Sequence, residues 1–277
     1  TACPSGVEYS RILEPFRLAT AQVRPAWKGR LDWFRQLVLL RIFPYPDRIR
    51  GALTPIRLLQ KAGLYDRLER MGLWDLFPPR LRAMLTLVNA PVPPGPALPG
   101  FLPAKGRRRA RVAFFLGCVA DAMFRHIHWA TVRVLQENGC DVLVPDGQVC
   151  CGAIHYHAGE EDGARRLADQ NVRAFPVDDV DAVIVNHAGC GAMLKEYGDY
   201  WHDDLAPRRR RFAEKVRDIN EFLDRLGFIP PIHAIEMTAT YHDACHLAHA
   251  QRVVEEPRRL LRQLPGLRLI PLPESNM

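Results

Sequence analysis

The sequence lacks the features that would mark the commonest membrane and enzyme classes directly. It contains no run of 18 apolar residues, and its best candidate, residues 37–43, is interrupted by Arg41, so no transmembrane helix is predicted. No charged segment followed by an apolar stretch opens the chain, so no signal peptide is visible. A serine-hydrolase elbow, a phosphate-binding glycine loop and an HExxH motif are all missing. Because the first residue is Thr1, we expect an upstream part of the protein.

Charge is distributed unevenly along a chain of ordinary composition. Of the 277 residues 48% are hydrophobic and 25% charged, which predicts a folded protein. Residues 11–111 carry 20 basic and 6 acidic side chains, whereas residues 112–277 carry 18 and 24. The basic front part favours an acidic partner, an anionic lipid surface or nucleic acid, or it is a solvated helical surface. It has no aromatic or groove-reading pattern, so a nucleic-acid binder is not predicted.

Cysteine is present in an odd number. There are seven, and an odd count without a signal peptide argues against a disulfide framework. We therefore expect metal or redox chemistry. The cysteines are Cys3, Cys118, Cys140, Cys150, Cys151, Cys190 and Cys245.

The front part of the chain has helical periodicity. Apolar residues recur at helical spacing in residues 31–38 and, less regularly, in 56–64. Five prolines punctuate these helices: Pro44, Pro46, Pro55, Pro78 and Pro79. Residues 91–103 are rich in Pro and Gly and predict a linker, and the basic tract 105–111 follows.

Strands and helices alternate after the linker, which predicts a parallel α/β layer. The predicted strands are 112–116, 141–145 and 182–185, and the predicted helices are 123–135, 160–175 and 212–226. The pattern then begins again, with strands at 238–242 and 268–271. In the first copy the pair Cys150-Cys151 follows the second strand closely. We therefore expect a second such pair beyond residue 277.

Four cysteines follow predicted strands of the first copy. Cys118, the pair Cys150-Cys151 and Cys190 each lie just after a strand, and in open α/β sheets the strand carboxyl ends face one crevice. Thiolates are soft ligands for iron–sulfur clusters, zinc or Cu(I), and Gly152 lets the backbone pass close to a bulky inorganic group. The alternative is that these are buried free cysteines, as we expect for Cys140.

Other candidate ligands carry weaker signals. Cys3-Pro4 matches the end of the bacterial ferredoxin signature, so Cys3 is a candidate ligand of a different cluster. Five histidines lie near the other cysteines, and we expect most of them to be ordinary polar residues: His155, His157, His187, His242 and His246. Residues 208–211, all arginine, predict a solvated helix start.

Together these residues resemble the cysteine-rich "CCG" domain. The resemblance rests on Cys118, on Cys150-Cys151-Gly152 with the acidic helix after it, and on NHAGCGAMLKEY at 186–197. That domain occurs in the cysteine-rich subunit of heterodisulfide reductase, in an anaerobic glycerol-3-phosphate dehydrogenase subunit, in lactate-utilisation proteins and in the glycolate oxidase iron–sulfur subunit. The last is the most similar, since TACPSGV at 1–7 resembles its second ferredoxin motif and YHDACHLAHAQ at 241–251 resembles the start of its second cysteine-rich half.

The resemblance implies a domain organisation. Residues 1–10 would be the tail of a [4Fe–4S] ferredoxin-type domain, and 11–103 a helical segment with a Pro-rich linker. Residues 110–236 would form the first CCG domain, and 237–277 the start of a second, truncated one. The implied fold is α/β, with a helical N-terminal segment before a repeated strand–helix domain.

The resemblance also implies a function. A partner subunit carrying FAD would oxidise glycolate or a similar 2-hydroxy acid, and this chain would relay electrons through [4Fe–4S] clusters to a quinone or another membrane acceptor. The ligands would be Cys3, Cys118, Cys150, Cys151, Cys190 and Cys245, with no catalytic residue in this chain. It would be a cytoplasmic oxidoreductase subunit, with room for a peripheral contact at the inner face of the cytoplasmic membrane. The full pattern often ends in Cys-x-x-Cys, but His187 stands at the first of those positions, so four cysteines would hold an ordinary cluster rather than a five-cysteine noncubane one.

Alternatives remain at this point. The relay could serve a heterodisulfide-reductase-like complex, or a lactate or glycerol-3-phosphate dehydrogenase. A zinc-stabilised interaction module would bind one zinc and undergo no redox change. A thiol–disulfide enzyme would use the vicinal pair Cys150-Cys151 at a depressed pKa.

Overall fold

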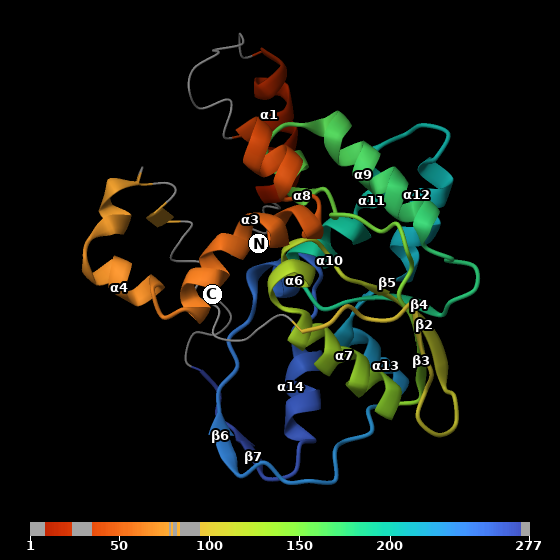
Figure 1. Cartoon of the computed structure of the whole chain (residues 1–277). Helices are drawn as coiled ribbons and strands as arrows, with labels where there is room; N and C mark the ends of the chain where they lie inside the picture. Colours follow the sequence, from red (N-terminus) through yellow and green to blue (C-terminus); the bar gives the residue numbers. More distant parts are fainter. Residues whose placement is uncertain (1–8, 24–34, 78, 80–81, 84–94, 273–277) are drawn as a thin grey trace.

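The computed structural model places a small parallel sheet between two layers of helices (Figure 1). It describes all residues except 1–8, 24–34, 78, 80–81, 84–94 and 273–277. The strand order is β1-β3-β2-β4-β5, and only β1 runs antiparallel to its neighbour. The strands are β1 (Phe101–Leu102), β2 (Ala110–Phe115), β3 (Cys140–Leu143), β4 (Ala182–Val185) and β5 (Val216–Asp218).

The helices of this domain cover both faces of the sheet. They are α6 (Val119–Met123), α7 (Arg125–Glu137), α8 (Ala153–His157), α9 (Glu161–Ala174), α10 (Ala188–Lys195), α11 (Tyr197–Tyr200), α12 (Ala206–Lys215) and α13 (Ile219–Leu226). Alternate residues of β2 point to opposite faces. Phe115 packs in one apolar cluster with Phe175 and Phe212, whereas Phe114 packs in the other with Leu135 and Phe222. The α/β prediction is confirmed.

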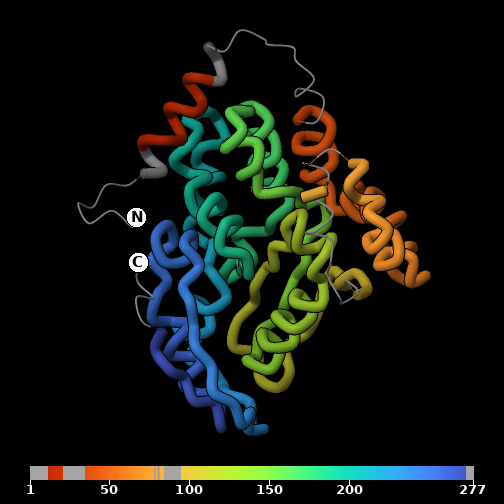
Figure 2. The backbone as a smooth tube through the Cα atoms, turned by 90° about the vertical axis from the view of Figure 1, so that its left-hand side faces the viewer, coloured from red at the N-terminus to blue at the C-terminus, as the bar shows by residue number. Residues whose placement is uncertain are grey.

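The front part of the chain is helical, as predicted, and lies against the sheet domain. Figure 2 shows α1 in red and α3 and α4 in orange on different flanks of the α/β layers. Pro55 does not interrupt a helix as expected but lies inside α3, whose first residue is Pro46, a position that tolerates proline. The elements are α1 (Tyr9–Val23), η1 (Arg35–Ile42), α3 (Pro46–Lys61), α4 (Tyr65–Arg70) and η2 (Leu73–Leu76).

The C-terminal part repeats the strand–helix–strand unit. The strands β6 (Met237–Ala239) and β7 (Leu267–Leu269) pair in parallel, with η3 (His246–Ala250) and α14 (Glu255–Arg262) between them. Leu260 of α14 joins the apolar cluster that also contains Phe222 and Leu223 of α13. The predicted second copy therefore exists and packs on the first.

Three local predictions are wrong. The predicted helix 212–226 is interrupted by β5: its apolar residues keep helical spacing, but Val216 is fully buried at the sheet edge and Asp218 caps α13 by accepting a hydrogen bond from the Asn220 N–H at 2.8 Å. The linker 91–103 contains β1, an edge strand in which Leu102 is buried. Arg209, expected in solvent, is fully buried.

Candidate functional site

Four thiols meet at the carboxyl edge of the sheet. Cys118 follows β2, Cys150 and Cys151 follow β3, and Cys190 lies in the first turn of α10 after β4. The Cys118 and Cys150 sulfurs are 3.4 Å apart. The Cys151 thiol interacts with those of both Cys150 and Cys190. The convergence expected from the strand order is therefore present as a contiguous row of thiols, of which only Cys190 is partly exposed.

Contact with one another together with burial raises the pKa of the Cys118, Cys150 and Cys151 thiols. The hydrogen bond with Cys150 and burial raise the pKa of Cys118 far above its ordinary value. For Cys151, contact with Cys150 lowers the pKa, but contact with Cys190 and complete burial outweigh it. A thiol–disulfide enzyme needs a depressed thiol pKa, so the site does not favour that alternative. A metal cation is the group that would compensate thiolates in such surroundings.

Two glycines shape the loops that carry the cysteines. Gly117 (φ +68°) and Gly152 (φ +85°) lie next to Cys118 and Cys151 in the left-handed region, which glycine adopts without strain. A Cβ on Gly152 would lie 3.1 Å from the Ala164 carbonyl oxygen, so the backbone next to the vicinal pair packs closely against α9. Gly152 therefore allows the close backbone approach that the sequence predicts.

A buried amide and a buried phenol fix the loop of the vicinal pair. The Asn171 side chain accepts a hydrogen bond from the Val149 N–H at 2.9 Å and donates one to the Cys150 carbonyl at 3.0 Å. The Tyr197 hydroxyl donates to the Cys151 carbonyl at 2.7 Å. Neither role was predicted from the sequence, although Tyr197 ends the motif at 186–197. A signal existed for Asn171, since an amide on the apolar face of α9, between Ala168 and Val172, needs a buried partner.

The front helices also reach the site. The Cys150 N–H donates to the Pro44 carbonyl at 3.3 Å, and Ile49 belongs to the same apolar cluster as Cys118 and Cys150. Arg50 of α3 pairs with the buried Asp121 of α6 at 2.7 Å. The helical segment therefore closes one side of the cysteine site.

His187 lies three residues before Cys190 and packs against a second histidine, His128. His187 ends the loop between β4 and α10, and its ring meets that of His128 edge to face, with centroids 5.2 Å apart. The Asn186 side-chain nitrogen lies 3.3 Å from His128 Nδ1. Burial lowers the pKa of His128 to about 4, and burial together with His128 lowers that of His187 to about 3. Both rings are therefore neutral near pH 7.

These depressed values predict that the metal-free protein is sensitive to acid. As the pH falls, His128 is protonated in the unfolded state at a higher pH than in the folded state. The free energy of unfolding therefore has its full contribution from the neutral ring above pH 6.5 and loses it as the pH falls toward 4. We expect a loss of about 3 kcal/mol from this residue, measured by urea unfolding at both pH values. In His128→Leu the free energy of unfolding should depend less steeply on pH. An unchanged slope would contradict the prediction, and His202→Leu, at an exposed residue, is the control.

Among the described residues, the remaining candidates share no side-chain hydrogen bond with the four thiols. Cys140 is fully buried at the start of β3, where burial raises its pKa to about 11, as expected for a core residue. Cys245 is exposed at the start of η3, and His242 and His246 beside it are exposed too. His155 is buried, while His157 lies 3.0 Å from Glu14. Cys3 falls outside the described residues.

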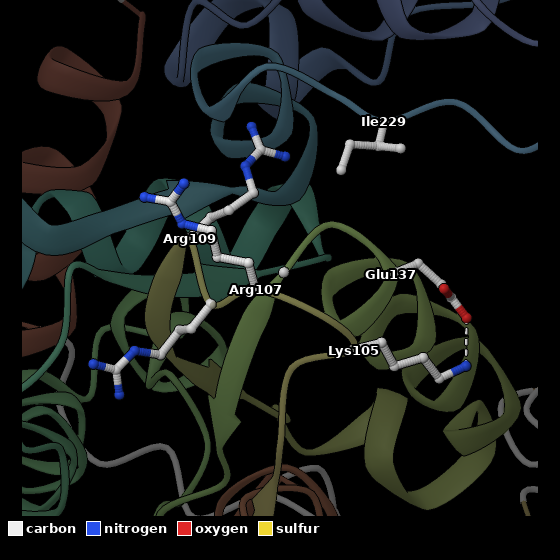
Figure 3. Close-up of a pocket in the computed structure, with 7 residues that line it drawn as sticks. Lys105, Arg107, Arg109, Glu137 and Ile229 are labelled. Atoms are coloured by element: carbon white, nitrogen blue, oxygen red, sulfur yellow. Dashed lines mark hydrogen bonds and ion pairs between the residues drawn. The ribbon is translucent and has the colours of Figure 1, made fainter.

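The basic tract forms a hollow at the other edge of the sheet. Figure 3 shows this hollow of about 570 Å³, which is lined by Lys105, Arg107, Arg108, Arg109, Glu137, Gly139 and Ile229. Lys105 pairs with Glu137, and Arg109 donates to the Gly227 carbonyl at 2.8 Å. Part of the basic charge therefore has a structural role, and the cysteines lie at the opposite edge.

The donor set fits an iron–sulfur cluster better than a single ion. Among the described residues, no three His, Cys, Asp or Glu side chains surround a point that could hold one metal ion. A [4Fe–4S] cluster takes four thiolates, one for each iron, so a row of four thiols matches it in number and softness. The sulfurs in contact would have to move apart around it.

None of the described helices has the length and hydrophobicity that a membrane crossing requires.

Two family descriptions match the chain. Residues 112–195 and 239–277 match the "Cysteine-rich domain" (CCG), so each copy of the repeat is covered. Residues 30–88 match "Glycolate oxidase iron-sulfur subunit, linker region", which corresponds to the helical segment beside the cysteines. No solved structure matches the chain.

Individual relatives agree with these matches. The chain is 39% identical over 271 residues to the "Probable glycolate oxidase iron-sulfur subunit" of Bacillus subtilis, covering 95% of this chain but 61% of the relative. It is 39% identical to one subunit of the "Fumarate reductase (CoM/CoB)" of Methanothermobacter marburgensis, covering 64% of this chain and 34% of the relative. It is 34% identical to "Lactate utilization protein A" of Geobacillus kaustophilus, covering 60% of this chain and 70% of the relative.

Proposed function

Because the chain belongs to the cysteine-rich CCG-domain family that includes glycolate oxidase iron–sulfur subunits, we propose that it relays electrons in a complex that oxidises a 2-hydroxy acid. The observation that carries the proposal is the row of four thiols at the carboxyl edge of the sheet. The chain spans 61% of the length of the Bacillus subtilis relative, and the proposal concerns the whole subunit.

Cys118, Cys150, Cys151 and Cys190 are the proposed ligands of one [4Fe–4S] cluster. When bound, the cluster supplies one-electron transfer. Asn171 and Tyr197 hold the carbonyls of the vicinal pair, so both thiolates keep their direction, and the apolar cluster around them excludes water. Cys245 is proposed as a ligand in the second copy. Cys3 is proposed as a ligand of a cluster in the ferredoxin-type domain of which residues 1–10 would be the tail.

The partners follow from the chemistry that this chain would not perform. A flavin subunit carrying FAD would take the hydride equivalent from the hydroxy acid, and the electrons would leave to a quinone or another membrane acceptor. The proposal assigns no catalytic residue to this chain. It includes a location in the cytoplasm, with peripheral contact at the inner face of the membrane. Nucleic acid is not a proposed partner.

The test is the metal content of the complete subunit. It would be expressed anaerobically with iron and sulfide, and iron, acid-labile sulfide and zinc would be measured together with the visible spectrum. Iron with matching sulfide and broad absorption near 400 nm, roughly where iron–sulfur proteins absorb, is the expected result. Zinc without sulfide would favour the interaction module. The absence of both iron and sulfide from the complete subunit would refute the proposal.

The substrate remains a choice between two 2-hydroxy acids. One relative is named for glycolate oxidase and another for lactate utilization. Bleaching of the cluster absorption in the assembled complex, on addition of glycolate or of lactate, would distinguish them. The glycolate assignment predicts faster bleaching with glycolate, and it is supported by the match of residues 30–88 to the linker region described for the glycolate oxidase iron-sulfur subunit.

A further inference from the structure

His187 faces the cysteine site at close range. A Cβ placed on Gly117 would lie 3.7 Å from His187 Nδ1 and 3.7 Å from the Cys190 sulfur. These two atoms therefore lie around the same point of the loop that leads to Cys118. The ring nitrogen borders the space that a group bound to Cys118 and Cys190 would occupy.

The nitrogen that borders this space has no partner. Among the described residues, His187 Nδ1 is buried and makes no hydrogen bond. A buried polar group without a partner is costly, so most such groups are satisfied by a neighbour or by a bound ligand. The Nδ1 atom is therefore available to a group bound beside it.

The ring cannot easily turn away. Its neighbour His128 is fully buried and also packs edge to face with Phe114. The Asn186 side chain donates to Thr131 at 2.9 Å and holds the adjacent stretch of backbone. These contacts fix the direction of the His187 ring before any group binds.

We propose that His187 donates a hydrogen bond from Nδ1 to a sulfur of the cluster held by Cys118, Cys150, Cys151 and Cys190, and so raises its reduction potential. The inference rests on the proposed function. Reduction adds one electron, supplied by the flavin partner, and increases the negative charge on the sulfurs. A fixed N–H donor stabilises the reduced form more than the oxidised form. The proton stays on Nδ1, and no bond breaks.

A donor fits His187 better than a ligand does. The four thiols already match the number of irons, and thiolate is the softer ligand for such a cluster. A Cys-x-x-Cys sequence would place a fifth thiolate at this position, whereas histidine brings a neutral ring. The position would therefore tune the cluster rather than hold it.

The test compares four forms of the complete, iron-loaded subunit. His187→Leu fills the space without a donor, His187→Gln keeps an N–H donor, and His202→Leu is an exposed control. The reduction potential would be measured by an EPR-monitored titration, and nitrogen coupling by pulsed EPR on protein with ¹⁵N-labelled histidine. We expect His187→Leu to keep its iron and sulfide, to shift to a lower potential and to lose a weak ¹⁵N coupling. His187→Gln should recover part of the shift.

Other outcomes would overturn the inference in distinguishable ways. Loss of iron in His187→Leu but not in His202→Leu, or a strong ¹⁵N coupling in the parent, would make His187 a ligand. An unchanged potential would show that the ring only fills space. A parent subunit without iron and sulfide would remove the proposed function itself, and the inference with it.

Discussion

Serine in place of Cys150 or Cys151 is expected to remove the buried cluster from the subunit. Each would lose one of the four proposed thiolates, and among the described residues no further thiol is hydrogen-bonded to this row. Replacement of residues that only orient metal ligands typically costs roughly 10- to 100-fold in affinity, so loss of a ligand should cost more. Iron, sulfide and the visible spectrum of the purified variants measure the effect. Cys118→Ser and Cys190→Ser should behave alike.

Cys140→Ala supplies the matched control. Cys140 is as deeply buried as Cys150, but it lies at the start of β3 rather than after its end. This variant should keep its iron and change only the stability of the fold. Equal iron loss in Cys140→Ala and Cys151→Ser would show that the cysteines act through packing, and would contradict the ligand assignment.

The meeting of the four thiols could be predicted because parallel strands impose it. Strands β2, β3 and β4 are adjacent and run the same way, so whatever follows them gathers at one edge. Residues 182–185 were predicted as a strand with the correct bounds, since a short run buried on both faces has a clear pattern. The alternation of strands and helices thus predicted the three central strands and the common edge at which they end.

The contacts that hold this edge in place could not be predicted from the sequence. The Pro44 carbonyl meets the Cys150 N–H across more than a hundred residues, and Asn171 reaches the vicinal pair from another helix. Such pairings depend on how layers pack, which no periodicity encodes. Strand β5 was hidden for a related reason: three residues between two helices acquire strand geometry only by pairing with β4.

Arg209 illustrates the same limit with a large energetic consequence. In a run of four arginines, nothing in the sequence distinguishes it from Arg211. The Arg209 side chain is fully buried, whereas that of Arg211 is 64% exposed. Arg209 pairs with Asp169 at 2.6 Å and with Asp203 at 2.8 Å, and its guanidinium lies over the Trp201 ring. Its hydrogen bond lowers the pKa of Asp203 to about 2, so the pair stays charged.

We therefore expect Arg209→Met to destabilise the protein by about 3 kcal/mol, because it removes the fully buried guanidinium and leaves the Asp169 carboxylate of α9, which is 17% exposed, without its cation. Arg211→Met, which breaks an exposed pair with Asp178, should cost at most about 0.5 kcal/mol. Urea unfolding at pH 7 measures both. Similar losses in the two variants would show that the buried network contributes no more than a surface pair. The double variant Arg209→Met with Asp169→Asn should recover part of the loss, since the second change removes the carboxylate that has lost its cation.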